Sequence, residues 1–123
     1  MRILLACLLL SLIFVSGCYY DSRDYLYPSL SAACSDTVNV TYSGKIAPIL
    51  SNSCTSCHGG SNPEGSILLE TYNEVKVFVD NGKLQSSIEH TGTASPMPKG
   101  IRKLDDCKIA AFAKWIQQGA PNN

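Results

Sequence analysis

Apolar residues recur three or four positions apart in four stretches of the chain, which is the spacing of one helix face. These stretches cover residues 42–53, 71–79, 83–89 and a last segment from 105 or 106 to 118. The third stretch is the weakest, because only Leu84 and Ile88 define its face. The short apolar run 67–69 has the character of an extended piece. The pattern therefore predicts about four helices in this part of the chain.

The first predicted helix contains a proline near its start. Ser43 is its candidate N-cap. Pro48 has no N–H and is tolerated only near the start of a helix, so the helix begins nearer Lys45 or bends there. Gly59 and Gly60 are expected to end it, because glycine adopts the left-handed conformations that close helices.

An uncharged run of thirteen residues, 3–15, follows Arg2, with Ser11 as its only polar member. It is too short to span a bilayer, which needs about 20 residues, and is typical of a signal peptide. The run ends in Val-Ser-Gly before Cys18, which resembles the cleavage box of bacterial lipoproteins, where the cysteine carries the lipid. The alternative is an ordinary signal peptide with a chance cysteine, although Phe14 fits its A-x-A-like site poorly.

Removal of residues 1–17 as a lipoprotein signal peptide would change the charge of the chain. Loss of Arg2 leaves nine Lys and Arg against ten Asp and Glu, a net charge of −1. Such a chain is not expected to bind nucleic acid or to adhere electrostatically to anionic lipid. Membrane attachment would then depend on the acyl chains of Cys18. Residues 18–33 contain four tyrosines without a sustained period, which indicates a partly ordered tether.

The most informative motif is Cys54-Thr-Ser-Cys57-His58. Two thiols two residues apart, followed at once by a histidine, form the attachment pattern of c-type haem. Each thiol adds to one vinyl group of the porphyrin, and the imidazole of His58 can bind the iron as its proximal ligand. The motif therefore predicts one covalently attached haem c.

Three other interpretations of the same motif are possible. A zinc site needs a second pair of Cys or His ligands at short spacing, and the chain has no such pair. A thioredoxin-like redox pair would follow a strand in a βαβ pattern, which does not surround Cys54. A structural disulfide between Cys54 and Cys57 is the third alternative.

A stiff loop carries the candidate for the second iron ligand. Pro96 and Pro98 bracket Met97 and fix the local backbone. A thioether held on a stiff loop suits a sixth haem ligand, because methionine is otherwise flexible. A core methionine is the alternative interpretation, and His90 is the competing ligand.

The last predicted helix has the clearest apolar face. Asp105 or Asp106 can cap it, and Gly119 followed by Pro121 ends it. Its apolar stripe consists of Ile109, Phe112, Ala113 and Ile116, with Trp115 adjacent. We expect this face to pack across the first predicted helix, with Trp115 or Phe112 near the haem.

Counting cysteines leaves one pair unassigned. Four of the six belong to the signal peptide, the lipoprotein site and the haem motif, namely Cys7, Cys18, Cys54 and Cys57. An exported chain enters an oxidising compartment, so Cys34 and Cys107 are expected to form a disulfide. Closing a loop of about 70 residues could stabilise the fold by about 4 kcal/mol. Two unpaired buried thiols are the alternative.

The order of the motif at 54–58, Met97 and a C-terminal amphipathic helix resembles class I c-type cytochromes. More narrowly, the chain is similar to small monohaem cytochromes of the Bacteroidetes and planctomycete type. There the haem motif follows a stretch like residues 40–50, the methionine lies in a stretch like 95–98, and the final helix precedes a segment like 119–121. The resemblance covers about residues 34–122, and we assign the domain to 34–123. It implies an all-α fold wrapped around one haem and supports the pairing of Cys34 with Cys107.

These expectations together describe an electron carrier rather than an enzyme. His58 and Met97 would saturate the iron, and the chain has no second haem motif of the kind that a dihaem peroxidase needs. We expect a monomer, lipid-anchored to a bacterial membrane facing the periplasm, that meets redox protein partners transiently. A haem-based gas sensor and the cytochrome subunit of a larger oxidoreductase are the alternatives.

Overall fold

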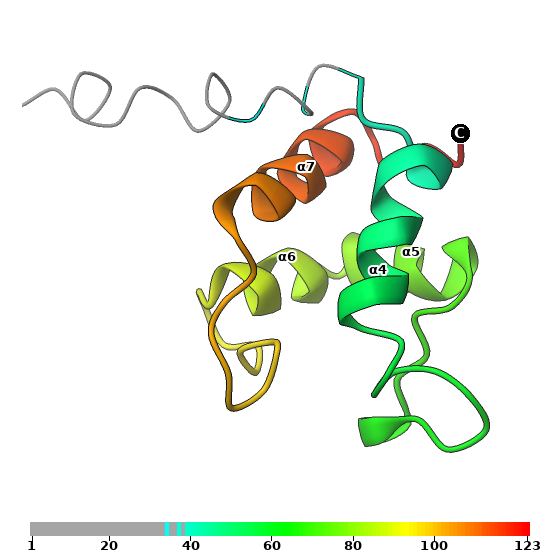
Figure 1. The fold of residues 1–123 in the computed structure, drawn as a ribbon, viewed down its shortest axis with the longest axis vertical. Helices are drawn as coiled ribbons and strands as arrows, with labels where there is room; N and C mark the ends of the chain where they lie inside the picture. Colours follow the sequence, from blue (N-terminus) through cyan, green and yellow to red (C-terminus); the bar gives the residue numbers. More distant parts are fainter. Residues whose placement is uncertain (1–33, 35–36, 38) are drawn as a thin grey trace, which may run out of the picture.

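The computed structural model describes residues 34, 37 and 39–123, and the predicted signal peptide, Cys18 and the tether lie outside them. The described residues contain four α-helices and no strand, which confirms the all-α fold class. No described helix is both long and apolar enough to cross a bilayer. In chain order the elements are η2 (Tyr42–Ile46, a π-helical turn), α4 (Ala47–Ser53), η3 (Glu64–Ser66), α5 (Tyr72–Asp80), α6 (Lys83–Glu89) and α7 (Asp106–Gln117) (Figure 1).

The first predicted helix is a π-helical turn that continues directly into α4. Its N-cap is Thr41, which has an extended backbone. The Thr41 Oγ1 accepts a hydrogen bond from the Gly44 N–H at 3.1 Å and so satisfies a free N–H of the first turn. The prediction of Ser43 as the cap was therefore wrong, because Ser43 already lies inside the turn. Pro48 lies in the first turn of α4, where its missing N–H costs no helical hydrogen bond. The irregularity predicted near Pro48 thus falls at the junction between η2 and α4.

A capping box begins α5. Glu74 lies one turn into the helix, and its Oε2 accepts hydrogen bonds from the backbone N–H groups of Thr71, at 2.8 Å, and Glu70, at 3.0 Å. The bond from Thr71 holds the pKa of the Glu74 carboxyl below its ordinary value. The start of α5 is therefore determined by a local pattern, Thr-x-x-Glu.

The core forms where η2, α5, α6 and α7 meet. In this packing η2 contacts α7, α6 contacts both α5 and α7, and α4 continues from η2. Trp115 of α7 is fully buried, with its ring centroid 5.6 Å from that of Tyr42 and 6.4 Å from that of Tyr72. The expected packing of the last helix across the first is confirmed at η2. The buried hydrophobic core comprises Val40, Tyr42, Ile46, Ile49, Leu50, Leu69, Val75, Leu84, Ile88, Ala111, Phe112, Trp115 and Ala120.

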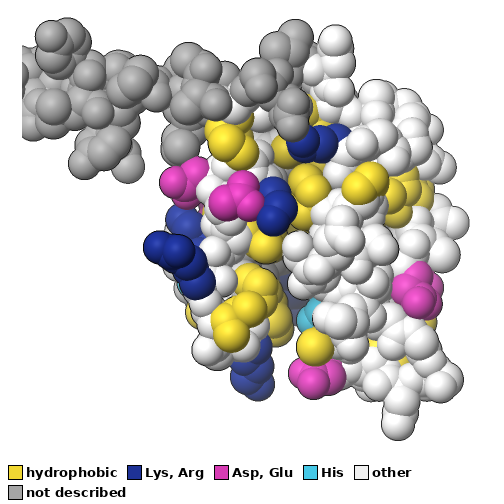
Figure 2. Space-filling model, in the orientation of Figure 1, with side chains coloured by type: hydrophobic (Ala, Val, Ile, Leu, Met, Phe, Trp, Pro, Cys, Tyr) yellow, Lys and Arg dark blue, Asp and Glu magenta, His cyan; other side chains and the backbone are white. Residues whose placement is uncertain are grey.

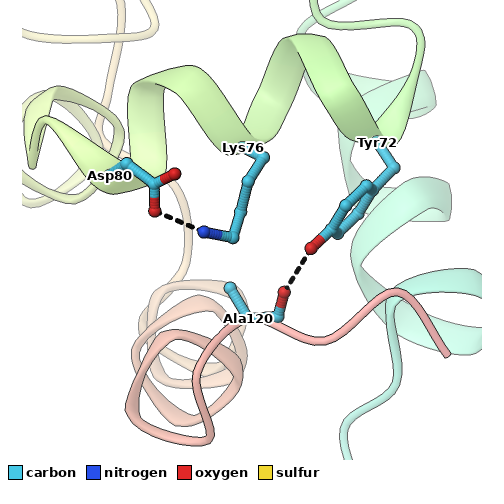
Figure 3. A network of polar contacts seen from close by, with 4 residues as sticks. All are labelled: Tyr72, Lys76, Asp80 and Ala120. Atoms are coloured by element: carbon cyan, nitrogen blue, oxygen red, sulfur yellow. Dashed lines mark hydrogen bonds and ion pairs between the residues drawn. The ribbon is translucent and has the colours of Figure 1, made fainter.

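Residues after α7 fold back over the core. The Tyr72 hydroxyl donates to the Ala120 carbonyl at 2.8 Å, beside the Lys76–Asp80 ion pair on the same helix (Figure 3). The indole N–H of Trp115 donates to the Pro121 carbonyl at 2.9 Å. Asn123 then accepts two hydrogen bonds from backbone N–H groups of η2: its Oδ1 accepts from Tyr42, and its backbone carbonyl oxygen accepts from Ser43. The C-terminal segment therefore caps the first turn of the fold.

Cys34 and Cys107 lie at bonding distance, with their Sγ atoms 1.98 Å and their Cα atoms 5.4 Å apart. The bridge joins the segment before η2 to the beginning of α7, across 73 residues of sequence. This geometry suits the expected pairing, which mass analysis under non-reducing conditions would test in the purified protein.

Candidate haem site

The Cys54–His58 motif forms a single turn directly after α4. The Cys54 N–H donates to the Leu50 carbonyl at 2.8 Å, so the motif starts as a continuation of the helix. The N–H groups of Cys57 and His58 then turn back to the Cys54 carbonyl, at 3.1 and 2.9 Å. Both thiols and the imidazole therefore belong to one turn, as attachment of a single haem requires.

The loop after the motif holds the backbone of this turn from the other side. The Glu64 N–H donates to the Cys57 carbonyl at 2.8 Å, and the Leu69 N–H donates to the His58 carbonyl at 2.9 Å. Leu69 is also buried in the core. The run 67–69, expected to be extended and to pack at the haem edge, therefore ties His58 to the rest of the fold.

Gly59 has a steric role that differs from the predicted one. Its backbone approaches Thr55 so closely that a Cβ atom would lie 2.6 Å from the Thr55 carbonyl oxygen. The helix ends at Ser53, as the predicted stretch 42–53 does, whereas the expectation that Gly59 and Gly60 end it was wrong, because the motif turn lies between α4 and these glycines. Gly59 then allows the chain to leave that turn next to Thr55.

The two thiols of the motif meet different surroundings. Cys54 is half-buried and packs against the core, whereas Cys57 is exposed. Burial raises the pKa of the Cys54 thiol to about 11, because a thiolate would lose its solvation there. At neutral pH Cys54 therefore presents a neutral thiol, and conversion to a thioether would place no charge in the apolar surroundings.

His58 has a ring nitrogen whose bonding is incomplete. Its Nδ1 atom is buried and has no hydrogen-bond partner in the described residues. A buried polar atom without a partner costs about 1–3 kcal/mol, so such atoms mark places where a further group completes the site. The unpartnered Nδ1 of His58 is compatible with an imidazole that binds a further group such as iron.

Met97 is anchored to the end of α6, on a different part of the chain from the motif. Its N–H donates to the Ser87 carbonyl at 3.0 Å, and its own carbonyl lies 3.0 Å from Nε2 of His90. Met97 is half-buried, and His90 is exposed. The structure therefore brings the two candidates for the sixth ligand into contact with each other through the Met97 backbone.

A hollow separates the two halves of the candidate site. Figure 2 shows a hollow on this face of the molecule. On one side of it lie α6, α7 and the segment that connects them, and on the other side lie α4 and the loop that follows it. A histidine side chain is visible in the hollow. In the same orientation, Figure 1 places the end of α4 and the connecting segment on opposite sides. Ile67, after the motif, and Leu104, after Met97, are both half-buried and pack against the core.

A separate pocket lies away from the candidate haem residues. Its volume is about 200 Å³, and it lies against η2 and α4 on a side that includes Thr55 and Glu70 but none of the four candidate haem residues. Within the described residues, no three His, Cys, Asp or Glu side chains gather into a group that could hold a metal ion.

No protein-family model, curated protein or solved structure matches this chain.

Several residues that support the candidate site were not identified from the sequence. Ser87 holds Met97, and Glu64 and Leu69 hold the motif, all through backbone groups. Backbone contacts between distant residues carry no residue-type signature. The Thr71–Glu74 capping box at the start of α5 is a residue pattern that the sequence could have indicated.

Proposed function

We propose that this chain is a class I c-type cytochrome that carries single electrons on one covalently bound haem. The observation that carries the proposal is the motif turn, in which Cys54, Cys57 and His58 share one turn while His58 Nδ1 is buried without a partner. Cys54 and Cys57 would hold the porphyrin through thioether bonds. His58 and Met97 would bind the iron.

The haem would supply one chemical property, the reversible one-electron change between ferric and ferrous iron. The chain's residues would determine how this property is used. His58 and Met97 leave no coordination position open to a substrate, which favours electron transfer over catalysis. Methionine is a weak donor that favours ferrous iron relative to a second histidine. Apolar residues such as Leu104 and Ile67 would act in the same direction, because the ferric state carries more charge.

The proposed cellular role is that of a carrier attached to a bacterial membrane facing the periplasm. Cys18 would carry the lipid, and residues 18–33 would form the tether. Electron transfer to redox proteins needs only a small and transient contact. A tethered monomer could serve more than one such partner, because the tether raises the local concentration of each.

A substitution of the proposed sixth ligand tests this function. We expect purified wild-type protein to retain its haem spectrum after denaturation and, when ferric, to show a charge-transfer band from thioether to iron. Met97→Ala should lose the band while keeping the covalent haem. Ile101→Ala is the matched control, since Ile101 lies on the same segment but is 69 % exposed. A chain without covalent haem, or a Met97→Ala variant with an unchanged band, would contradict the proposal.

Two alternatives retain the haem but change its use. A gas sensor would release Met97 to admit a ligand, and a subunit of a larger oxidoreductase would relay electrons within a complex. Rapid binding of carbon monoxide to the reduced protein at neutral pH would favour the sensor. Co-purification of a stable complex from mildly solubilised membranes would favour the subunit.

A further inference from the structure

The helix α6 ends at a histidine with an uncommon backbone conformation. His90 is the C-cap of α6 and has φ 58° and ψ 42°, in the left-handed region. A residue with a Cβ atom is strained in this region, and helices usually place glycine or asparagine there. A residue that keeps this strained conformation often has a side chain with a specific role.

The imidazole of His90 contacts the backbone of Met97. Nε2 lies 3.0 Å from the Met97 carbonyl oxygen. Because a carbonyl can only accept a hydrogen bond, the ring must donate it. The Met97 N–H donates to the Ser87 carbonyl, one turn earlier in α6, at 3.0 Å. Both backbone polar groups of Met97 are therefore held by the end of the same helix.

These contacts close the loop between His90 and Met97. The loop leaves α6 at His90 and returns at Met97 to the same helix end, where the Ser87 carbonyl accepts from both residues, at 3.3 Å from His90 N and 3.0 Å from Met97 N. The backbone bond to Ser87 fixes only the N–H side of Met97. The His90 ring fixes its carbonyl side, and thus the orientation of the peptide that follows the proposed iron ligand.

We propose that His90 is a positioning residue, whose ring donates a hydrogen bond to Met97 and holds the loop that presents the Met97 thioether. The contact itself is independent of haem, whereas its purpose rests on the proposed function. In this role His90 and Met97 are cooperating residues and not competing ligands. The ring accounts for the presence of histidine at a position where glycine would be less strained.

Two substitutions separate this role from that of a helix cap. His90→Gly removes the ring and also relieves the left-handed strain, so the free energy of unfolding should stay constant or rise. His90→Gln keeps a side-chain N–H donor and the same backbone strain. If the ring holds Met97, the Met97 amide hydrogen should exchange about fivefold faster in His90→Gly. In His90→Gln the exchange rate should stay closer to that of wild type.

The exchange rate is measured on the full purified chain by NMR, together with urea unfolding and the thioether-to-iron band. We expect His90→Gly to combine unchanged or higher stability, faster exchange at Met97 and a weaker band. Wild-type exchange at Met97 in His90→Gly would overturn the proposal. Loss of six-coordinate iron in His90→Gly but not in Met97→Ala would also overturn it, by making His90 the ligand. A wild-type protein without the band would contradict the assignment of Met97 as iron ligand. The exchange rates would still show whether the His90 ring holds the Met97 backbone.

Discussion

Cys54 and Cys57 belong to one turn, but the fold gives them different surroundings. Cys54 directly follows α4 and packs against the core, whereas Cys57 is exposed. Burial raises the pKa of Cys54 to about 11, which keeps its thiol protonated through the neutral range. The two thiols should therefore differ in reactivity wherever they are not bonded to haem.

In chain produced without haem attachment, we expect iodoacetamide to modify Cys54 much more slowly than Cys57 at pH 8. With a pKa of about 11, only about 0.1 % of Cys54 is thiolate at pH 8, and the thiolate is the nucleophile. Its rate should rise about tenfold for each pH unit up to about pH 11. Peptide mass spectrometry of samples quenched over time measures both rates. Equal rates at pH 8 would show that Cys54 is not buried as described.

At the scale of elements, α5 shows how a carboxylate at a helix start links stability to pH. Glu74 accepts the N–H groups of Thr71 and Glu70 more strongly when it is ionised, and these bonds therefore lower its pKa. A lowered folded-state pKa means that the contribution to stability is present above the unfolded value, near 4.5, and is lost as the pH falls through the folded value.

Glu74→Gln should therefore destabilise the protein at pH 7 and have a smaller effect at pH 3. As the pH falls, the wild-type carboxyl becomes protonated more often, so the two side chains become more alike in charge. Glu74 is exposed to solvent screening, and we expect a small difference. Urea unfolding of both proteins at the two pH values measures it. Glu64→Gln is the control, because Glu64 is exposed on η3 and caps no helix with its side chain. A destabilisation of equal size at pH 3 would contradict the linkage.

Local patterns predicted the helices well wherever the cause was local. The stretch predicted at 71–79 is α5, Tyr72–Asp80, and the weak stretch at 83–89 is α6, Lys83–Glu89. Both depend on apolar spacing and nearby caps, which are visible in a short window. The predicted first stretch begins at residue 42, as η2 does, but its N-cap was assigned to Ser43 instead of Thr41, because both are suitable N-caps and the choice depends on backbone conformation.

The tertiary parts of the candidate site could not be predicted in the same way. Residue types alone identified Cys54, Cys57 and His58, since the chemistry of attachment prescribes their spacing. The contact between the His90 ring and the Met97 carbonyl joins a side chain to a backbone atom, which any residue type could supply. From the sequence, His90 could only be considered as a rival ligand.

At the scale of the whole molecule, the described chain has two ends of different character. Residues 39–41, η2 and the C-terminal segment lie at one end, where Asn123 bonds to η2 (Figure 1). The end of α4 and the segment that carries Met97 lie at the other end.

The proposed membrane attachment depends on a single cysteine, Cys18. If Cys18 carries the lipid, Cys18→Ser should move the protein from the membrane pellet to the soluble fraction, because the mature chain lacks the net positive charge that would retain it on anionic lipid. Cys7→Ser is the matched control: it changes another cysteine of the N-terminal region, lies inside the predicted signal peptide and should leave the protein in the pellet. Fractionation followed by detection of covalent haem in each fraction measures the distribution and shows that export still occurs. Haem-containing Cys18→Ser protein that remains in the pellet would mean that something other than the lipid on Cys18 holds it there.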